Sequence, residues 1–286
     1  MEQVAIYAYQ IGVSISIFIL ISLGLAIIFG MMGVINLAQG EFLMLGAYTC
    51  AIATNAGVNL WLSMLIAGLV VGLFGIVVER VIIRFLYGRI VDTLLATWGL
   101  SLFLVGGVTT LFGPQSKSVI NPLGNVAMGD YTLSQYSLVM MAIAVAMLAG
   151  TYALWRFTRA GLIVRGTMQN PDMARGLGVN TGRVYMLTFG FGAALTGFAG
   201  AVLAPITGAA PPMGIFFIAK AFVTVISGGH LPLIGTITAT TLFGAIDGAV
   251  AFAYSSVVGE MSVLFVAIIL LRLLPMGITG RLRRGL

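Results

Sequence analysis

The stretch from Ile6 to Phe29 reads IYAYQIGVSISIFILISLGLAIIF and carries no charged residue. A helix needs roughly 20 mostly apolar residues to cross the hydrocarbon core of a bilayer, so this stretch is long enough to span a membrane. No Lys or Arg precedes it, and it therefore lacks the basic region of a cleaved signal peptide. We interpret it as a retained transmembrane helix.

The rest of the chain has the composition of a multi-spanning membrane protein. Of its residues, 60% are hydrophobic and 8% are charged, whereas an ordinary soluble domain carries about 25% charged residues. Further stretches that meet the length test are residues 60–78, 92–112, 136–155, 184–204 and 257–274. The single cysteine, Cys50, excludes an intramolecular disulfide.

Two other apolar regions are interrupted. The region 33–55 contains polar side chains and is predicted to be a broken or functional helix; these side chains are Asn36, Gln39 and Glu41. The region 214–253 holds two apolar pieces separated by Gly-Gly-His-Leu-Pro at 228–232. The first piece, of about 15 residues, would cover only some 22 Å, so it could be a half-helix, a re-entrant arm or a short span.

Charge asymmetry predicts the orientation, because cytoplasmic loops carry an excess of Lys and Arg. The segments expected in the cytoplasm contain Arg80, Arg84 and Arg89, the five arginines of 156–183, and Arg272, Arg281, Arg283 and Arg284 near the C-terminus. The loop 113–135 has Lys117 as its one basic residue and should face the opposite side. The net charge of +6 does not indicate nucleic-acid binding, since no basic patch is interleaved with aromatic residues.

We therefore predict an all-α, polytopic bundle of about eight or nine transmembrane helices that forms a single domain over residues 1–286. Small residues recur at every fourth position of the predicted span 184–204, namely Gly192, Thr196, Gly200 and Ala204. Such stripes let helix backbones approach closely in lipid. Close packing within one bundle is favoured over a dimer interface for any single stripe.

The polar loop 156–183 reads RFTRAGLIVRGTMQNPDMARGLGVNTGR and interrupts this apolar chain. Asn170 can cap a helix, Pro171 suits the first helical position, and Asp172 complements the positive end of the helix dipole. Met173, Ala174 and Leu177 would then form an apolar ridge, ended by Gly176 and Gly178. A helix of about two turns is marginal in water, so it should dock on a cytoplasmic partner, or lie on the bilayer or its own bundle.

Three separated motifs resemble one protein family. They are GMMGVINLAQGEFLMLGAY at 30–48, the loop followed by GVNTGRV at 178–184, and KAFVTVISGG at 220–229. Together they make the chain similar, over nearly its whole length, to the permease subunits of branched-chain amino acid ABC importers, a family that also includes urea and short-amide permeases. The resemblance implies an importer in the bacterial inner membrane, and the charge asymmetry predicts that its C-terminus lies in the cytoplasm.

The same resemblance implies partners and site residues. The partners are a second homologous permease in a heterodimer, two cytoplasmic ATP-binding cassette ATPases, a periplasmic substrate-binding protein and membrane lipid. Residues 165–178 become the coupling helix that docks into an ATPase, with coupling contacts expected from Arg165, Asn170, Pro171, Met173, Ala174, Leu177 and Gly178.

Two departures from the family pattern bear on the substrate. Gln39 stands where we expect His in the amino-acid permeases, and His230-Leu-Pro-Leu-Ile replaces a Gly-rich run. Lys220 stands where we expect Asp in the urea branch, which favours amino acids or an amide-like relative. Urea or a short amide remains the alternative substrate.

Glu41 and Lys220 lie inside apolar segments, where a charged side chain costs at least ~2.5–3.5 kcal/mol. Such residues normally face the bundle interior and pair, so we predict that they line or gate a translocation path and meet each other or Asp247. Asn36 and Gln39 would add neutral hydrogen-bonding groups to a polar break. The alternative is that Glu41 only caps or braces a broken helix and that Lys220 extends to an interface.

Other function classes are less consistent with the sequence. No Gly-x-x-x-x-Gly-Lys-Ser/Thr motif is present, so the chain is not expected to hydrolyse ATP itself. An ion-coupled secondary transporter, with Glu41, Asp247 or Glu260 as relay groups, is the first rival. An intramembrane protease would need His230 to activate a membrane Ser, and no Gly-x-Ser-x-Gly is present. With one His and one Cys we expect no metal site, and we expect no cofactor.

Overall fold

The structure is a computed structural model that describes residues 2–121, 123–128, 131–229 and 231–280. Its helices are α1 (Glu2–Met32), α2 (Gln39–Asn55), α3 (Leu60–Val81), α4 (Ile90–Phe112), α5 (Gln135–Phe157), α6 (Arg159–Gln169), α7 (Pro171–Gly176), α8 (Thr181–Thr207), α9 (Met213–Gly228), α10 (Pro232–Ala253) and α11 (Ser256–Leu273), with a 3₁₀ turn at Ile83–Phe85. His230 and the arginines at 281, 283 and 284 lie outside the described residues.

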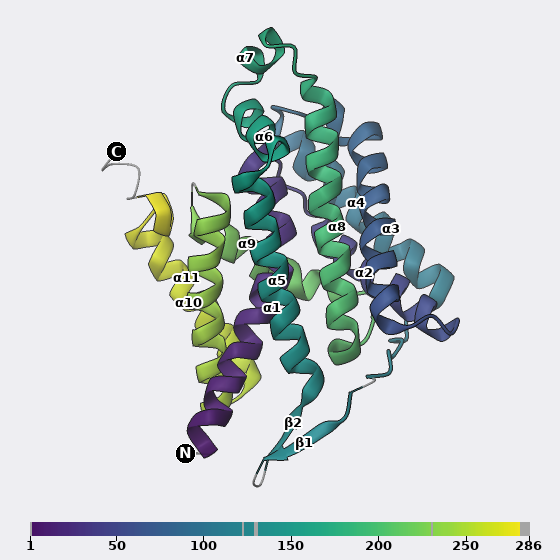
Figure 1. The fold of residues 1–286 in the computed structure, drawn as a ribbon, viewed down its shortest axis with the longest axis vertical. Coiled ribbons are helices and arrows are strands. Elements are labelled where there is room, and N and C mark those ends of the chain that lie inside the picture. The colour runs from purple at the N-terminus through teal and green to yellow at the C-terminus, as the bar shows by residue number, and fades with distance from the viewer. Residues whose placement is uncertain (1, 122, 129–130, 230, 281–286) are drawn as a thin grey trace.

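The all-α prediction is confirmed, apart from one small hairpin. Strands β1 (Asn125–Met128) and β2 (Tyr131–Ser134) pair antiparallel, with Val126 opposite Leu133. This hairpin follows α4 in a loop that was not expected to hold regular structure. Figure 1 places it at one end of the bundle and places α6 and α7 at the other. We call these the hairpin end and the α6–α7 end.

Seven helices in the described chain are long and apolar enough to cross a membrane: α1, α3, α4, α5, α8, α10 and α11. They include the six uninterrupted spans that the sequence predicts. The interrupted regions give two shorter helices, α2 with 17 residues and α9 with 16. The predicted total of eight or nine is reached only when α2 and α9 are counted with the seven.

Helices α1 and α8 form the centre of the bundle. In their most apolar windows 72% and 67% of the residues are buried, against 22% for α4 and 17% for α11. The centre is apolar: Phe42 of α2 packs edge-on against both Phe74 of α3 and Phe189 of α8. Burial of large side chains such as these, at roughly 25 cal/mol per Å² of apolar surface, would stabilise a soluble core. In lipid, where this hydrophobic term is absent between helices, close packing at small residues stabilises the association of the helices.

The small-residue stripe of α8 packs inside the same chain, as predicted. A Cβ on Gly24 of α1 would collide with Thr196 and the Gly192 carbonyl, and a Cβ on Gly200 would collide with the Leu43 carbonyl of α2. The three helices therefore approach backbone to backbone. This contact fixes where α2 begins beside α8, and so it positions the polar groups of the helix break.

Candidate functional site

The predicted break near residue 36 lies between α1 and α2 and is held by its own polar side chains. The Asn36 amide accepts a hydrogen bond from the Ala38 N–H at 3.1 Å and donates one to the Gln39 Oε1 at 3.1 Å. Gln39 in turn donates to the Thr196 hydroxyl of α8. Asn36 and Gln39 are both buried. The polar residues that interrupt the apolar pattern thus stabilise the interruption.

Two half-length helices begin at this break. The first turns of α2 and α9 meet at Gly40 and Gly214, where a Cβ on either residue would collide with the other's backbone. From there α2 runs beside α4 to the contact between Tyr48 and Phe112, and α9 runs to its tight contact with α10 at Gly228. Helix N-termini carry partial positive charge, so two of them meet inside the bundle.

Glu41 lies at this meeting point. Its side chain is 1% exposed, and its Oε1 accepts a hydrogen bond from the Ser101 hydroxyl of α4 at 2.7 Å. Its Oε2 lies against Gly214 and has no hydrogen-bond partner among the described residues. A carboxylate at the first turns of two helices is favoured by their dipoles. We call Asn36, Gln39, Glu41, Ser101 and Thr196 the helix-junction cluster.

Lys220 does not meet Glu41, and this part of the prediction is wrong. The Lys220 ammonium of α9 forms an ion pair with Glu260 of α11, with Nζ 2.8 Å from Oε1. The reason is the geometry of α9: Gly214, which contacts Glu41, is six residues from Lys220, about 240° around the helix. The two residues therefore face different neighbours.

Asp247 of α10 lies in this second group without a direct ion pair to Lys220 among the described residues. It lies within Coulombic range of both Lys220 and Glu260, and Ser14 of α1 lies beside its carboxylate. We call Ser14, Lys220, Asp247 and Glu260 the ion-pair cluster. The five predicted pathway residues thus divide between two clusters, and Glu260, Ser101 and Thr196 are polar partners that sequence reasoning did not assign to them.

The polar loop contains two helices in place of one. Thr158 caps α6 by accepting from the Gly161 N–H at 3.1 Å, and Asn170 caps α7 by accepting from the Met173 N–H at 2.9 Å. Asn170 and Pro171 occupy the predicted cap and first helical positions. The range 165–178 is therefore broken at Asn170, which has an extended backbone, and Arg165 belongs to α6.

The predicted apolar ridge on α7 is reduced to two residues. Met173 and Leu177 are 63% and 78% exposed, whereas Ala174 is 7% exposed and faces the chain itself. Arg175 donates to Asp172 at 2.9 Å and to Thr181 of α8 at 3.1 Å, which joins α7 to the start of α8. Gly178, with φ +83°, ends the turn as expected. The loop presents a small apolar surface on a braced support.

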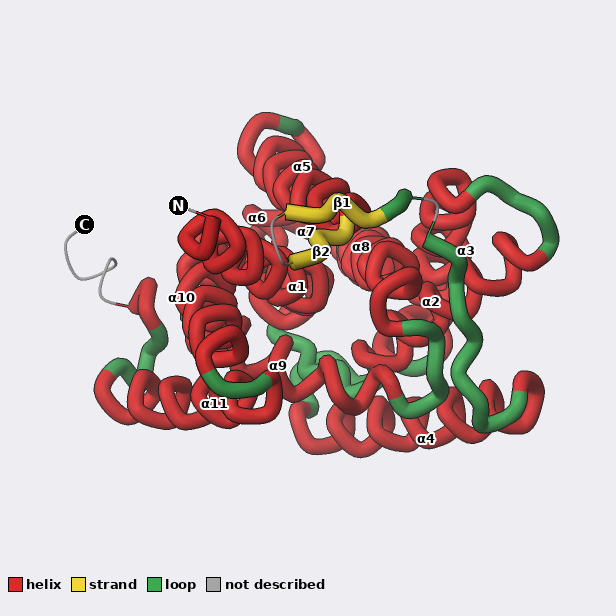
Figure 2. Tube along the Cα trace, turned by 90° about the horizontal axis from the view of Figure 1, so that it is seen from below, coloured by secondary structure: helices red, strands yellow, loops and turns green. Residues whose placement is uncertain are grey.

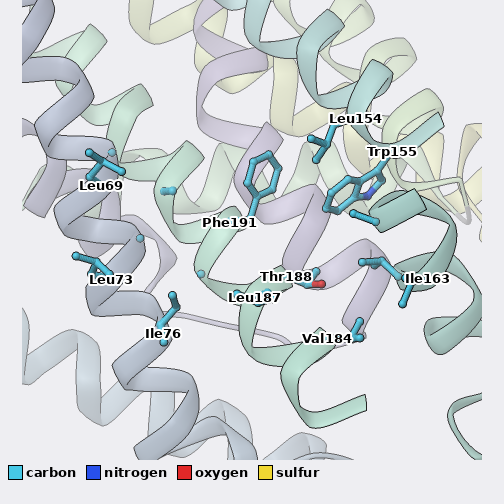
Figure 3. A pocket seen from close by; sticks show the side chains of 16 residues that line it. Leu69, Leu73, Ile76, Leu154, Trp155, Ile163, Val184, Leu187, Thr188 and Phe191 are labelled. Atoms are coloured by element: carbon cyan, nitrogen blue, oxygen red, sulfur yellow. The ribbon is translucent and has the colours of Figure 1, made fainter. Parts of the chain in front are cut away.

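Two grooves flank this loop. A broad groove of about 560 Å³ between α3, α5, α6 and α8 is lined by apolar side chains, Trp155, Phe191 and Leu187 among them, with Thr188 as the single polar side chain (Figure 3). It has no group that could pair with a charged solute. A smaller polar cleft lies where α3 ends and α8 begins; its lining is Glu79, Arg80, Arg84, Asn180, Gly182, Arg183 and Met186.

Tyr87 lies on the loop beside this cleft. Its hydroxyl donates to the Glu79 carboxylate at 2.8 Å, and its ring packs on Tyr185 with centroids 4.8 Å apart. Burial, and then the hydrogen bond to Glu79, raise the pKa of the Tyr87 phenol. The phenol therefore stays neutral and serves as a donor that holds the loop against the bundle.

Comparison with known proteins gives the family. Residues 7–274 match the family described as branched-chain amino acid transport system / permease component. The high-affinity branched-chain amino acid transport system permease protein LivH of Escherichia coli is 32% identical to this chain. The alignment has 307 positions, gaps included, and covers 98% of this chain and 97% of that protein. BraD of Pseudomonas aeruginosa, with the same description, is 28% identical, with 93% and 92% covered.

A more distant relative is a differently named permease protein of the same kind of system. LivM of Escherichia coli is 26% identical over 237 residues, which cover 73% of this chain and 55% of that protein. No solved structure matches the chain. The match to the family covers well over half of the residues, and the chain belongs to the family of permease components of branched-chain amino acid transport systems.

Proposed function

We propose that this protein is the transmembrane permease subunit of an ATP-binding cassette importer for branched-chain or related amino acids. It forms half of a translocation pathway, and a periplasmic binding protein delivers the substrate. Its relatives LivH and BraD carry names of branched-chain amino acid transport permeases. The family is a membrane permease component, so the chain is a transport subunit without catalytic activity of its own.

The observation that carries the proposal is the exposed pair Met173, in the capped helix α7, and Leu177, which caps its C-terminus. Figure 1 shows α7 at one extreme end of the molecule. The sequence has no phosphate-binding loop for ATP. Energy must therefore arrive through a contact, and a short helix with one exposed apolar residue in it and another at its C-cap, four positions on, is a suitable one. The ATPase-coupling contacts are assigned to Arg165, Asn170, Pro171, Met173, Leu177 and Gly178, with Ala174 supporting them from beneath.

The test is to replace Met173 and Leu177 together by Asp. The charged variant should lose co-purification with the ATPase subunits, because two carboxylates would have to be desolvated in the contact. Ser116→Asp together with Ser118→Asp adds the same two negative charges in an exposed loop at the hairpin end; it is the matched control and should retain the ATPase. Undiminished ATPase on the double variant would contradict the docking assignment.

Charge supports the orientation. Arg156 and Arg165 line a pocket with Leu231 and Pro232, which places the turn between α9 and α10 at the α6–α7 end. Thr279 donates to the Gly228 carbonyl at 2.6 Å, so the last described residues pack on that same turn. Because basic residues favour the cytoplasmic side, we place the α6–α7 end and the C-terminus in the cytoplasm of a bacterial cell, with the protein in the inner membrane.

One side of the molecule is suitable as a contact surface for a second permease subunit. Figure 2 shows α4, α9 and α11 along one side of the molecule, with α9 between the other two. Both α4 and α11 are little buried by their own chain. The existence of LivM beside LivH in one organism supports a heterodimer, in which the pathway runs along α9 between the two subunits. On this arrangement the ion-pair cluster borders the pathway, and the helix-junction cluster lies behind α9.

Two rival functions have distinct outcomes. The first is the same importer with urea or a short amide as its substrate. Identifying the ligand that co-purifies with the partner binding protein tests this alternative. An ion-coupled secondary transporter would use Glu41, Asp247 or Glu260 as relay groups. It predicts uptake by the purified chain alone, driven by an ion gradient, whereas the proposed importer requires ATP and its partners.

A further inference from the structure

The ion-pair cluster joins three helices at one place. Besides the pair between Lys220 and Glu260, it contains Asp247, which makes no direct ion pair among the residues that the structure describes. Gly259 lets α11 lie close to α10, because a Cβ there would be 3.2 Å from the Asp247 Oδ1. The cluster therefore holds one cation and two carboxylates, and one carboxylate lacks a cation.

The cluster is also accessible from outside the chain. The Lys220 side chain is 21% exposed and the Glu260 side chain is 51% exposed. Lys220 belongs to α9 and Glu260 to α11, two helices that Figure 2 shows on the same side of the molecule. Charged groups exposed to acyl chains are strongly disfavoured, so this surface has to border water or another protein rather than lipid. A ligand arriving there would meet both signs of charge.

A zwitterionic amino acid has the complementary charges. Its carboxylate can take the place of Glu260 on the Lys220 ammonium, and its own ammonium can then pair with Asp247 or Glu260. The exchange pairs both charges of the ligand and leaves the cluster with one excess carboxylate, as it has at rest. An uncharged amide such as urea would separate Lys220 from Glu260 and supply no charge to either, which leaves two charges to be desolvated without a partner.

An apolar surface for the side chain lies next to this charge. Phe216 precedes Lys220 by four residues on α9, so the two side chains share a face of that helix. Its ring is 70% exposed. A head group held by Lys220 would therefore leave a branched aliphatic side chain in contact with an aromatic ring.

We propose that the ion-pair cluster binds the charged head group of an amino acid during its passage, with Lys220 on the carboxylate, Asp247 and Glu260 on the ammonium, and Phe216 beside the side chain. The proposal rests on the proposed function and assigns Glu260 a role in substrate selection. Without substrate, Lys220 pairs with Glu260; a bound zwitterion separates this pair because its carboxylate replaces Glu260 on Lys220.

The test uses the complete importer in lipid vesicles: this permease, the second permease, the ATPases and the binding protein, with labelled leucine as the probe. Lys220→Met and Glu260→Gln should each lower the initial rate of uptake per assembled complex by about tenfold or more, because each removes a charge-assisted contact. Phe265→Ala is the matched control: it lies on α11 about 140° around the axis from Glu260, and its uptake should stay at the wild-type rate.

The reversed pair Lys220→Glu with Glu260→Lys separates binding from a merely structural role. It restores an ion pair, so assembly should return, but it moves the cation from α9, where Phe216 shares its face, to α11, so uptake should stay low. Uptake restored by the reversed pair, or undiminished in Lys220→Met, would overturn the proposal. If Lys220→Met does not assemble, the proposal is tested by uptake in Glu260→Gln, which keeps the size of the side chain. A wild-type complex that takes up no amino acid would instead contradict the proposed function.

Discussion

The helix-junction cluster and the ion-pair cluster differ in how far their side chains are exposed. The buried cluster can only hold helices together, whereas the exposed cluster can also contact a ligand. In the helix-junction cluster Asn36, Gln39 and Glu41 are all at most 1% exposed and are bonded mainly to one another and to neighbouring helices. In the ion-pair cluster Glu260 is half exposed. The first cluster holds α2 and α9 together, whereas the second can exchange its partners.

The difference also shows in how charge is stabilised. Glu41 has one hydroxyl partner and two helix N-termini but no cation within its cluster, so its environment favours a carboxylate through dipoles and tolerates little change of shape. Lys220 and Glu260 neutralise each other directly at 2.8 Å. A change of side-chain size should therefore disrupt folding at the junction, whereas a change of charge at the ion pair should disrupt transport.

The largest effect is expected from Gly214→Val. A side chain there would collide with the Glu41 carboxylate and with the backbone of Gly40, which cannot move away without separating α2 from α9. Overpacking typically costs about 1–3 kcal/mol, and contact with backbone places this site at the upper end. We expect loss of monodisperse protein in size-exclusion chromatography after detergent extraction.

The control for that change is Gly106→Val on α4. Gly106 has no atom within 4 Å of the position of a Cβ, so the same substitution should leave the yield unchanged. If Gly214→Val extracts as well as Gly106→Val, the two first turns do not touch as described. The junction would then be a loose break, and its contrast with the ion-pair cluster would disappear.

The next effect is expected from Glu41→Gln. The amide keeps the size of the side chain and an oxygen for the Ser101 hydroxyl, so the bundle should assemble with little change in its thermal midpoint. If Glu41 acts only as a brace, uptake survives. If its charge serves the pathway, as we expect, the initial rate of leucine uptake falls by about tenfold, the cost of one charge-assisted contact.

Glu79→Gln is the matched control for this change. Glu79 is 2% exposed and accepts a hydrogen bond from Tyr87, so it is as buried as Glu41 and has a comparable partner, but it lies at the end of α3 away from the junction. Its replacement should leave uptake near the wild-type rate. Equal losses in both variants would mean that any buried acid is needed for assembly.

Local sequence patterns predicted the elements better than the contacts. The predicted span 92–112 falls within α4, and Asn170 caps α7 as expected, because helix length and caps depend on neighbouring residues in the chain. The partner of Lys220 was missed because Glu260 is 40 residues away. The position of α11 in the bundle depends on its close approach to α10 at Gly259, a property of packing that no local pattern encodes.

The break in the loop was missed for a related reason. Residues 159–169 form α6, which Thr158 caps, but the residues alone predicted only one helix, starting at Asn170, and the family resemblance assigned one helix to the range 165–178. Two caps twelve residues apart mark two short helices, and that signal was present in the sequence. The hairpin at 125–134 lies in a loop with no hydrophobic alternation strong enough to indicate it.

The smallest effect is expected from Ser14→Ala in the ion-pair cluster. Ser14 lies beside the Asp247 carboxylate, and its hydroxyl is one neutral donor among charged groups. Its loss should change uptake only about two- to threefold, within the range of a single net hydrogen bond.

Ser16→Ala is the control, since Ser16 is equally buried but donates to the Gly12 carbonyl of its own helix at 2.7 Å. A change in uptake confined to Ser14 would show that Asp247 takes part in transport, because the hydroxyl can act there only through that carboxylate. Equal uptake in both variants would leave Lys220 and Glu260 as the working pair and assign Asp247 to packing against α11.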